Sequence, residues 1–355
     1  MNIHDIMSML AEQEGSDIHI MVGSQPTIRV NGLLKPIPDS PVLKKELAES
    51  LILPLMTQEQ KEYVVVNKEI DFGYQFMDIG RFRVNVYHQQ DSLAAALRLI
   101  PARIKTIDDL QLPQIFHEFT QYKQGLVLLT GATGEGKSTT LAALIDAINT
   151  TRSEHILTIE DPIEFIHTPR KSIISQRELN KDTHGWDLAL RSALREDPDI
   201  VLVGEMRDLE TISAAITVAE TGHLVFATLH TTTAAQTIDR IIDVFPSRQQ
   251  SQVRQQLAGT LQAVVSQRLV PSSQGGRLAA FEIMVANPAI RNLIREGKTH
   301  QIDNVLQTSA EEGMMLIEGY LSMLVQRGAI SLETARAFAF RPDELDRLTT
   351  GGSVT

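Results

Sequence analysis

The segment that most constrains the fold of this chain is Gly131-Ala-Thr-Gly-Glu-Gly-Lys-Ser138. It fits the pattern G-x-x-x-x-G-K-[ST], it follows the apolar run Leu126–Leu129, and it precedes a stretch of helical character. In such a strand–loop–helix unit, glycines let backbone N–H groups turn inward around phosphates at the positive end of the helix. The segment therefore predicts a P-loop in an α/β protein.

The chemistry of a P-loop assigns roles to its residues. Lys137 is expected to reach the β- and γ-phosphates of ATP, and the Ser138 hydroxyl to ligate Mg²⁺. The residues expected to bind the nucleotide are Gly131, Thr133, Gly134, Glu135, Gly136, Lys137, Ser138 and Thr139. ATP and Mg²⁺ are therefore the predicted ligands.

Apolar runs alternate with helical stretches from Gly125 onward, which is typical of a parallel sheet covered on both faces. The expected strands are Leu126–Thr130, His155–Ile159, Ile200–Val203 and Leu224–Thr228. After about residue 245 the pattern is mostly helical, and we expect the tail Thr349–Thr355 to be disordered.

The first hundred residues have the pattern of a small α/β domain with an antiparallel sheet. A helix over residues 3–13 precedes strands at Asp17–Val22, Thr27–Val30, Ile70–Phe76, Arg81–His88 and Ser92–Ile100. Asn31-Gly32 between alternating apolar positions is a strong hairpin signal. We therefore expect an N-terminal domain over 1–100, a linker with a short helix over 101–113, and an ATPase domain over 114–355.

Carboxylates follow two of the expected strands. Glu205 comes one glycine after Ile200–Val203 and is the candidate for holding the magnesium shell. Glu160, Asp161 and Glu164 crowd the end of another strand. An ATPase needs one carboxylate to orient and deprotonate the attacking water, and we favour Glu164 with Glu160 as its rival. A solvated acidic turn is the alternative interpretation.

Two histidines, His223 and His230, stand at opposite ends of the expected strand Leu224–Thr228. A lone histidine is more often structural than catalytic. Two histidines beside a P-loop sheet favour the interpretation that they sense the γ-phosphate of ATP. Neither has partners at the spacing of a metal site.

The composition narrows the class of protein. A formal net charge of −11 disfavours a DNA motor, because proteins that bind the nucleic-acid backbone usually present a basic surface. The absence of cysteine excludes disulfides and thiolate metal sites. No apolar run reaches the roughly 18–20 residues of a membrane span, and the N-terminus lacks a secretory signal, so we expect a cytoplasmic protein.

Four segments in this order resemble the secretion ATPase superfamily, which drives type II secretion and type IV pili. They are GATGEGKS, TIEDPIEF, DPDIVLVGEMRD and TGHLVFATLHT, matching a P-loop, an aspartate box, a degenerate Walker B strand and a histidine box. The resemblance runs from about Ser16 to Arg347. Within the superfamily, Ala289–Glu296 reads AIRNLIRE, a motif associated with pilus retraction ATPases.

The resemblance implies a PAS-like N-terminal domain, a RecA-like ATPase domain and a six-membered ring with ATP at the subunit boundaries. Arginines of the N-terminal domain would then reach the phosphates, with Arg83 and Arg98 as the best matches and Arg81 as the third. Arg240 is expected to line the site. The alternative is that these are surface arginines on a half-exposed strand.

The implied function is a hexameric motor that hydrolyses ATP to power type IV pilus retraction and twitching motility. The implied partners are further copies of the chain and the pilus platform protein, with docking at the inner face of the cytoplasmic membrane and no nucleic acid. A pilus-extension or type II secretion ATPase is the alternative within the superfamily. A DNA-dependent ring ATPase and a non-hydrolysing scaffold are the alternatives outside it.

The sequence departs from the family pattern in its P-loop, which usually has proline at position 132 and serine or threonine at 135. Here these residues are Ala132 and Glu135. We expect the Glu135 side chain to point to solvent, with slower turnover or altered nucleotide affinity at most. His88-Gln-Gln-Asp91 stands where relatives often have an arginine, which leaves one basic contact fewer.

Overall fold

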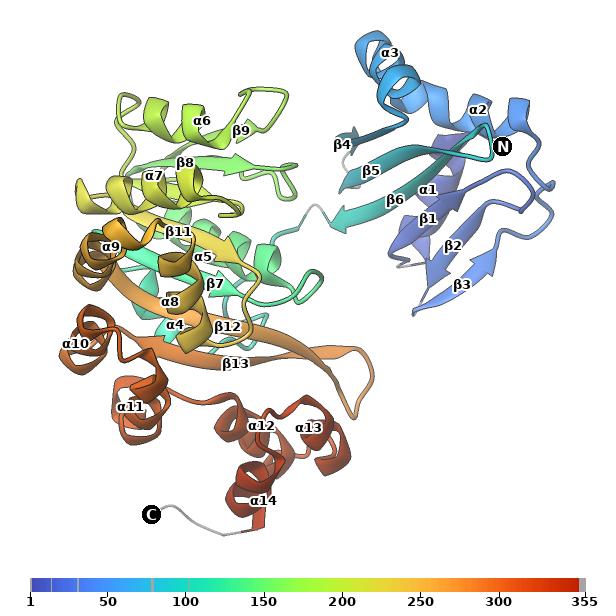
Figure 1. Cartoon of the computed structure of the whole chain (residues 1–355). Helices are drawn as coiled ribbons and strands as arrows, with labels where there is room; N and C mark the ends of the chain where they lie inside the picture. The colour runs from blue at the N-terminus through green and yellow to red at the C-terminus, as the bar shows by residue number, and fades with distance from the viewer. Residues whose placement is uncertain (1, 14, 31, 78–79, 102, 351–355) are drawn as a thin grey trace. The chain divides into compact units, whose positions relative to one another are not determined.

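The computed structural model describes every residue except 1, 14, 31, 78–79, 102 and 351–355. The described chain forms two compact units, residues 1–104 with 162–166 and residues 105–161 with 167–355. Each unit has its own sheet (Figure 1), and the expected α/β class is confirmed. The expected turn residue Asn31 and most of the tail Thr349–Thr355 lie outside the described residues.

Among its described residues, the first unit contains a six-stranded antiparallel sheet in the order β3-β2-β1-β6-β5-β4. The strands are β1 (Asp17–Ile20), β2 (Thr27–Val30), β3 (Leu33–Pro36), β4 (Glu69–Phe76), β5 (Gly80–Gln89) and β6 (Ser92–Pro101). The side chains of β5 alternate, so that Phe82, Val84 and Val86 are buried in the core while Arg83 and Asn85 point to the opposite face.

The helices of the first unit supply the other half of its core. They are α1 (Ile3–Glu12), α2 (Lys45–Ile52) and α3 (Gln58–Asn67). A capping box starts α1, because the Asn2 side chain accepts from the Asp5 N–H and the Asp5 carboxylate accepts from the Asn2 N–H. The buried Ile6 and Leu10 of α1 pack with the apolar side chains of the sheet.

The second unit is built on a seven-stranded sheet, counted over the residues that the structure describes, in the order β13-β12-β7-β11-β10-β8-β9. Its strands are β7 (Gly125–Thr130), β8 (His155–Glu160), β9 (Ile173–Glu178), β10 (Ile200–Val203), β11 (Leu224–Leu229), β12 (Leu261–Pro271) and β13 (Arg277–Val285). All neighbouring pairs are parallel except β12 and β13. The strands β7, β10 and β11 are buried along their whole length, which explains their continuous apolar sequence.

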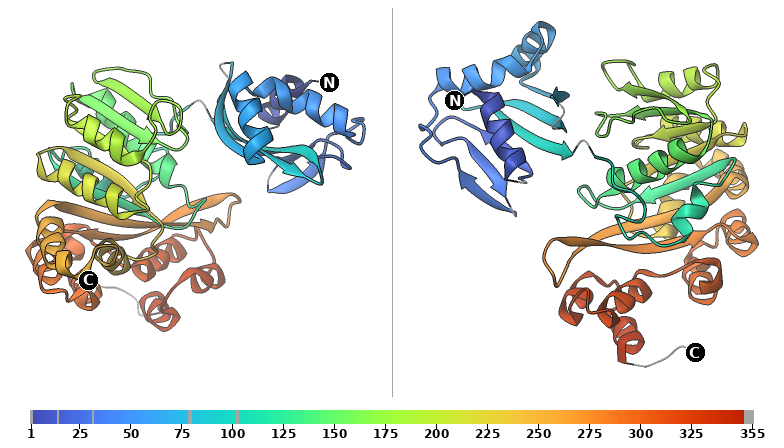
Figure 2. Two further views of the ribbon diagram at one scale, coloured as in Figure 1. Left: turned by 45° about the horizontal axis from the view of Figure 1, so that its top comes forward. Right: turned by 180° about the vertical axis from the view of Figure 1, so that it is seen from behind.

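Helices cover both faces of this sheet (Figure 2), each face with its own apolar core. One core includes side chains of α6 (Trp186–Ala193), α7 (Leu209–Glu220), α8 (Ala234–Asp243), α9 (Ser247–Thr260), α10 (Pro288–Glu296) and α11 (Ile302–Thr308). The other includes side chains of α4 (Ile115–Phe119), α5 (Lys137–Thr151), α12 (Ile317–Gln326), α13 (Leu332–Phe338) and α14 (Pro342–Thr350).

Two expectations about the secondary structure were wrong. The region after residue 245 is not mostly helical throughout, because β12 and β13 form a long hairpin at the edge of the sheet. The short apolar run at the start of β12 cannot be told from a buried helix by periodicity alone. The short helix expected within 101–113 is also absent from the described residues of that range, where 107–111 form a turn and α4 begins at Ile115.

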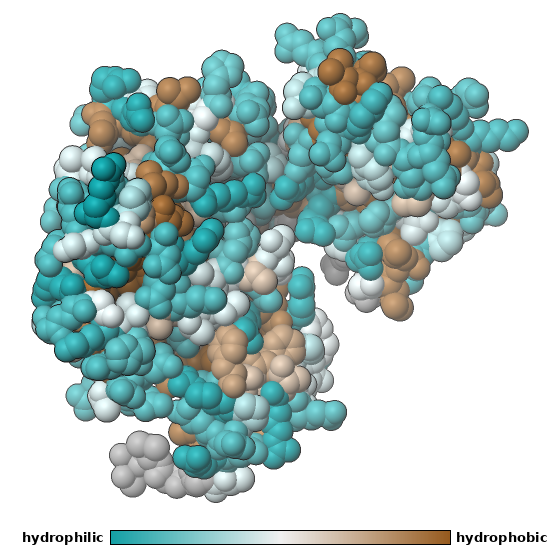
Figure 3. Space-filling model, viewed as in Figure 1, coloured by the Kyte–Doolittle hydropathy of each residue, from teal (hydrophilic) through white to brown (hydrophobic). Residues whose placement is uncertain are grey.

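No helix among the described residues is long and apolar enough to cross a membrane. The face drawn in Figure 3 is mostly polar with scattered apolar side chains. Val65 and Val66 on α3 are among the most exposed large apolar residues of the described chain.

Candidate nucleotide site

The P-loop joins β7 to α5 in the second unit, as the sequence predicts. Gly131 and Gly136, at the two ends of the loop, have φ values of 142° and 81°, which only glycine adopts without strain. A Cβ atom on Gly131 would also overlap the carbonyl oxygen of Gln267 in the neighbouring strand β12. Both glycines are therefore required by the backbone itself.

Lys137 is the first residue of α5, and its side chain folds back over the loop. Its Nζ donates to the carbonyl oxygens of Gly131 at 2.7 Å and Ala132 at 3.0 Å. The ammonium group is thus held inside the loop that would surround phosphates, and the side chain is almost fully buried. Thr133 and Gly134 form the exposed tip of the loop, and Ser138 and Thr139 lie half-buried in the first turn of α5.

The carboxyl ends of four parallel strands meet at this edge of the sheet. The register pairs Thr130 with Leu229, Ala227 with Val203, and Val203 with Ile159. The P-loop after β7, the residues after β11 and β10, and the end of β8 therefore share one edge. His230, Glu205 and Glu160 are the polar residues at these three strand ends.

Glu205 and His230 form a pair at this edge. The Nε2 atom of His230 lies 2.8 Å from Oε1 of Glu205, and the Arg207 Nη2 donates to Oε2 of Glu205 at 2.7 Å. Burial raises the pKa of Glu205, but the hydrogen bonds and charges of Arg207 and His230 outweigh it, so that the pKa is lowered and the carboxylate is ionised. Arg207 was not among the residues predicted for the site, although it lies two residues after Glu205.

These residues fit a hydrated magnesium ion. No group of three or more His, Asp or Glu side chains in the described part of the chain could hold a metal by itself. Mg²⁺ is usually held by one or two protein groups together with waters and substrate phosphates. The Ser138 hydroxyl and the ionised Glu205 supply such groups, and the Arg207 side chain on Glu205 is 69% exposed and can swing aside.

The two candidate bases lie in different units. Glu160 ends β8 in the second unit, where its Oε1 accepts from the Thr158 hydroxyl at 2.7 Å and the Gln176 amide at 3.3 Å. Glu164 is half-buried in the segment 162–166, which belongs to the first unit. Of the two candidate bases, Glu160 is therefore the one that the fold of the second unit brings to the P-loop edge.

His223 is not brought to this edge. It precedes β11, at the end of the strand opposite to His230, and its carbonyl accepts from the Gly125 N–H at the start of β7. Its ring Nδ1 lies 3.0 Å from the Thr221 hydroxyl and 3.0 Å from the Val218 carbonyl, at the C-terminal end of α7. Within one chain, His223 therefore cannot touch the same phosphate as His230, because the length of β11 separates them.

The predicted arginines occupy ordinary strand and helix positions. Arg83 donates to Asp71 from Nη2 at 2.6 Å, and Arg98 donates to Asp17 from Nε at 2.9 Å, both on the sheet of the first unit. Arg81 is buried in β5. Arg240 is exposed on α8 in the second unit.

Glu135 does not point to solvent as expected. Its carboxylate accepts a hydrogen bond from the backbone N–H of Leu269 in β12, and its carbonyl accepts from the Gln267 side chain at 2.7 Å. The negative charge is thus engaged by an internal amide. Gln267 was not among the residues predicted for the site, although the polar pair Ser266-Gln267 inside an apolar run is a signal for it.

The AIRNLIRE segment forms α10 and contacts α9. Ile290 and Ile294 are fully buried, and the Arg291 Nη1 donates to the carbonyl oxygens of Ala258 at 2.6 Å and Gly259 at 3.0 Å, at the end of α9. Half of the motif is therefore explained by packing and helix capping.

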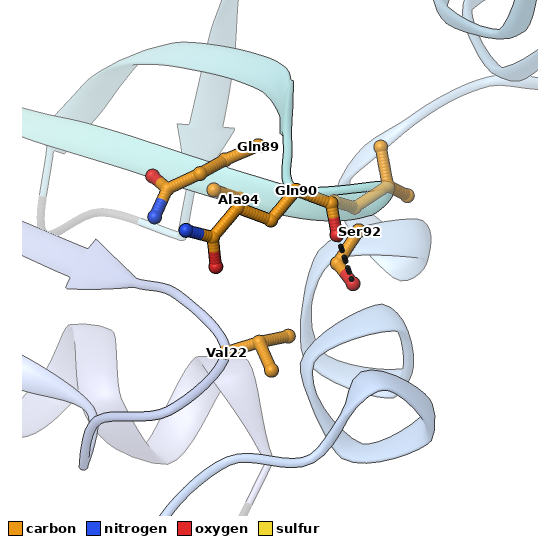
Figure 4. A pocket seen from close by; sticks show the side chains of 6 residues that line it. Val22, Gln89, Gln90, Ser92 and Ala94 are labelled. Carbon is orange, nitrogen blue, oxygen red and sulfur yellow. Dashed lines mark hydrogen bonds between the residues drawn. The ribbon is translucent and has the colours of Figure 1, made fainter.

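A small surface hollow in the first unit (Figure 4) contains none of the predicted site residues. Its walls come from the β5–β6 hairpin and the end of β1, and they are Val22, Gln89, Gln90, Ser92, Leu93 and Ala94.

The chain is similar to known proteins over nearly its whole length. Residues 2–336 match the family described as Type II/IV secretion system protein. The type IV pilus retraction ATPase PilT of Pseudomonas aeruginosa is 48% identical over 343 residues, which are 97% of this chain and 99% of the relative. A twitching motility protein of Neisseria gonorrhoeae is 49% identical over 88% of this chain and 83% of the relative. The crystal structure of the pilus retraction motor PilT with bound ADP superposes with a TM-score of 0.90 at 46% identity, over 98% of this chain and 99% of the other.

Proposed function

The chain belongs to the Type II/IV secretion system protein family, and we propose that within it the protein is the ATPase that powers retraction of type IV pili. The observation that carries the proposal is the 48% identity to a retraction ATPase over nearly the full length of both chains. The P-loop, with Lys137 folded over it, supports ATP as the fuel. Retraction produces twitching motility, so this is the expected behaviour of the cell.

Each residue at the P-loop edge has its own proposed role in ATP hydrolysis. When bound, Mg²⁺ and ATP supply the phosphate bond to be broken and a cation that neutralises its charge. Lys137 would exchange the carbonyl oxygens of Gly131 and Ala132 for phosphate oxygens, and Ser138 and Glu205 would hold the magnesium shell. A carboxylate, Glu164 or Glu160, accepts a proton from the attacking water as the bond from water to phosphorus forms. His230, whose Nε2 lies 2.8 Å from Glu205, stands at the P-loop edge as the proposed sensor of the γ-phosphate.

The same proposal includes a ring of six copies with ATP at the subunit boundaries. The second unit has the P-loop, Glu205 and His230, whereas Arg83 and Arg98 belong to the first unit. Guanidinium groups suit the task because they stay charged and span two phosphate oxygens. The ring is proposed to act from the cytoplasm, docked on the pilus platform protein at the inner face of the membrane.

The test is deletion of the gene in the native host, scored by pilus length and twitching on a surface. Long pili that do not retract, restored by the wild-type gene but not by Lys137→Ala, are the expected result. Cells without pili would instead assign the motor to extension, and normal pili with loss of secreted enzymes would assign it to type II secretion.

A further inference from the structure

The side chain of Gln267 in β12 spans the P-loop and the helix that follows it. The residue is 2% exposed. Its Oε1 accepts from the Thr140 hydroxyl of α5 at 2.8 Å, and its Nε2 donates to the carbonyl oxygen of Glu135 at 2.7 Å. One rigid amide thus joins the last part of the loop to the first turns of the helix.

The backbone and neighbours of Gln267 reach the rest of the loop. Its carbonyl oxygen lies against the Cα of Gly131, and its Nε2 would be 3.0 Å from a Cβ atom on Gly136. On either side of it, the Ser266 hydroxyl lies 2.9 Å from that of Thr130, and the Leu269 N–H donates to the Glu135 carboxylate. The strand β12 therefore contacts the loop at its start and at its end.

We propose that Gln267 is a positioning residue for the nucleotide, which holds the P-loop in the conformation that binds phosphates. The inference rests on the proposed function, since it takes ATP to be the ligand of this loop. A loop that is already in its bound conformation loses less conformational entropy on binding, so the affinity is higher. The amide is buried, and each of its hydrogen bonds is therefore difficult to replace by water.

Three substitutions separate the two halves of this contact. Gln267→Leu removes both hydrogen bonds and keeps a side chain of similar size. Thr140→Val removes only the bond to the helix. Gln267→Glu keeps an acceptor for Thr140 but places a carboxylate oxygen against the Glu135 carbonyl oxygen, so that repulsion between two acceptors replaces the hydrogen bond to the loop. Gln262→Ala is the matched control, because Gln262 lies in the same strand but bonds to Gln124 and Arg291, away from the P-loop.

The experiment measures MgADP binding by calorimetry, the kcat and KM of ATP hydrolysis, and hydrogen exchange of the 131–138 amides in the full-length protein. We expect Gln267→Leu and Gln267→Glu to weaken MgADP binding about tenfold or more and to raise KM more than they lower kcat. Thr140→Val should have a smaller effect in the same direction, and the loop amides should exchange faster in all three. Gln262→Ala should behave like the wild type.

Thermal melting of each variant distinguishes positioning from loss of the fold. If folded Gln267→Leu binds MgADP within about twofold of the wild type, the proposal is wrong. If Gln267→Leu does not fold, Thr140→Val decides in its place, and unchanged affinity with unchanged loop exchange would overturn the inference. A wild-type protein that binds no MgADP would instead refute the proposed function.

Discussion

Arg83 and Arg98 stand directly opposite each other on the antiparallel strands β5 and β6. Like charges at opposite positions repel, and here each guanidinium has a carboxylate beside it, Asp71 for Arg83 and Asp17 for Arg98. The side chains remain 40% and 64% exposed. The first unit therefore presents two paired arginines on the face of its sheet that is turned away from its own core.

Substituting these arginines should impair hydrolysis more than binding. Arg83→Ala and Arg98→Ala remove charge that acts on the phosphate as its negative charge develops, which costs on the order of a few kcal/mol of transition-state stabilisation. We expect kcat to fall about a hundredfold or more while the MgADP affinity changes little. Arg29→Ala is the matched control, because Arg29 also lies near Asp17, at 3.5 Å.

If the arginines act on a neighbouring subunit, the activity must also depend on assembly. Specific ATPase activity should rise with protein concentration through the range in which rings form, measured together with mass by light scattering. A proven monomer with full activity, and with both arginine variants near wild type, would exclude this mechanism.

Lys137→Ala should abolish ATP hydrolysis and leave the fold intact. The ammonium group is the only full positive charge that the P-loop itself provides, and it donates to the backbone carbonyls of Gly131 and Ala132. Turnover should be compared with the wild type at saturating ATP, and circular dichroism serves as the control for folding. Unchanged turnover would be incompatible with an ATPase at this loop.

Glu160→Gln and Glu164→Gln decide between the two candidate bases. The amide keeps the size and hydrogen bonding of the carboxylate but cannot accept the proton of the attacking water. The sequence favours Glu164, and we expect its variant to bind ATP but to hydrolyse it at least about a hundredfold more slowly. Single-turnover hydrolysis of both variants is the measurement. An inactive Glu160→Gln beside an active Glu164→Gln would assign the base to the end of β8.

The exposed side of α10 should be needed for retraction but not for hydrolysis. Asn292 and Arg295 are exposed, whereas Ile294 is buried in the core. We expect a double substitution of Asn292 and Arg295 to alanine to keep ATPase activity and ring assembly and to abolish twitching. Ile294→Ala is the contrast, because a cavity in the core should cost about 2–5 kcal/mol of stability and affect every assay. Normal twitching by the double variant would mean that the motif serves only to pack α10 against its neighbours.

Glu282 in β13 should make the protein less stable as the pH rises. Burial raises the pKa of this carboxyl from 4.5 to about 7, and the nearby charges of Asp303 and Glu318 also raise it. The Ala234 N–H, which donates to the carboxylate, and the charge of Arg341 lower the pKa but do not outweigh burial. Because the folded state holds this proton more tightly than the unfolded state, the stabilising contribution is fully present below pH 4.5 and is lost as the pH rises to about 7.

The variant Glu282→Gln removes this dependence, since its amide oxygen can still accept from the Ala234 N–H. At pH 8 its free energy of unfolding should exceed that of the wild type by up to about 3 kcal/mol, and the gain should shrink towards pH 5. Urea unfolding at both pH values is the measurement, with exposed Glu311→Gln as the control. An equal difference at both pH values would contradict the raised pKa.

Elements of this chain could be predicted from the sequence where one local pattern determines one structure. The P-loop and the strands β7, β8, β10 and β11 were predicted because glycine spacing and continuous apolar runs are unambiguous there. The hairpin of β12 and β13 was missed, since its place beside β7 depends on contacts more than a hundred residues apart in the chain. For the same reason the partners of the loop, Gln267 and Leu269, were not found.

Periodicity also could not show which end of the strand at Leu224–Thr228 lies beside the P-loop. His223 and His230 read as a symmetric pair, but the parallel direction of β11 brings only His230 to the P-loop edge. Glu135 was expected in solvent because its partner, a backbone N–H, has no signature in the sequence.

The strand β12 has an irregularity in its register with β7 between Leu261 and Ala263. Beyond it, neighbouring residues point to opposite faces, so that Gln267 meets the P-loop while Arg268 lies over the Phe340 ring, 3.9 Å from its centroid. A deletion between Ala263 and Gln267 would exchange the two faces, placing a guanidinium where the amide belongs. Loss of Gln262, inside the irregularity, would leave the later residues in phase. Relatives should therefore differ in length at position 262, and they should have no insertions or deletions at positions 263–267.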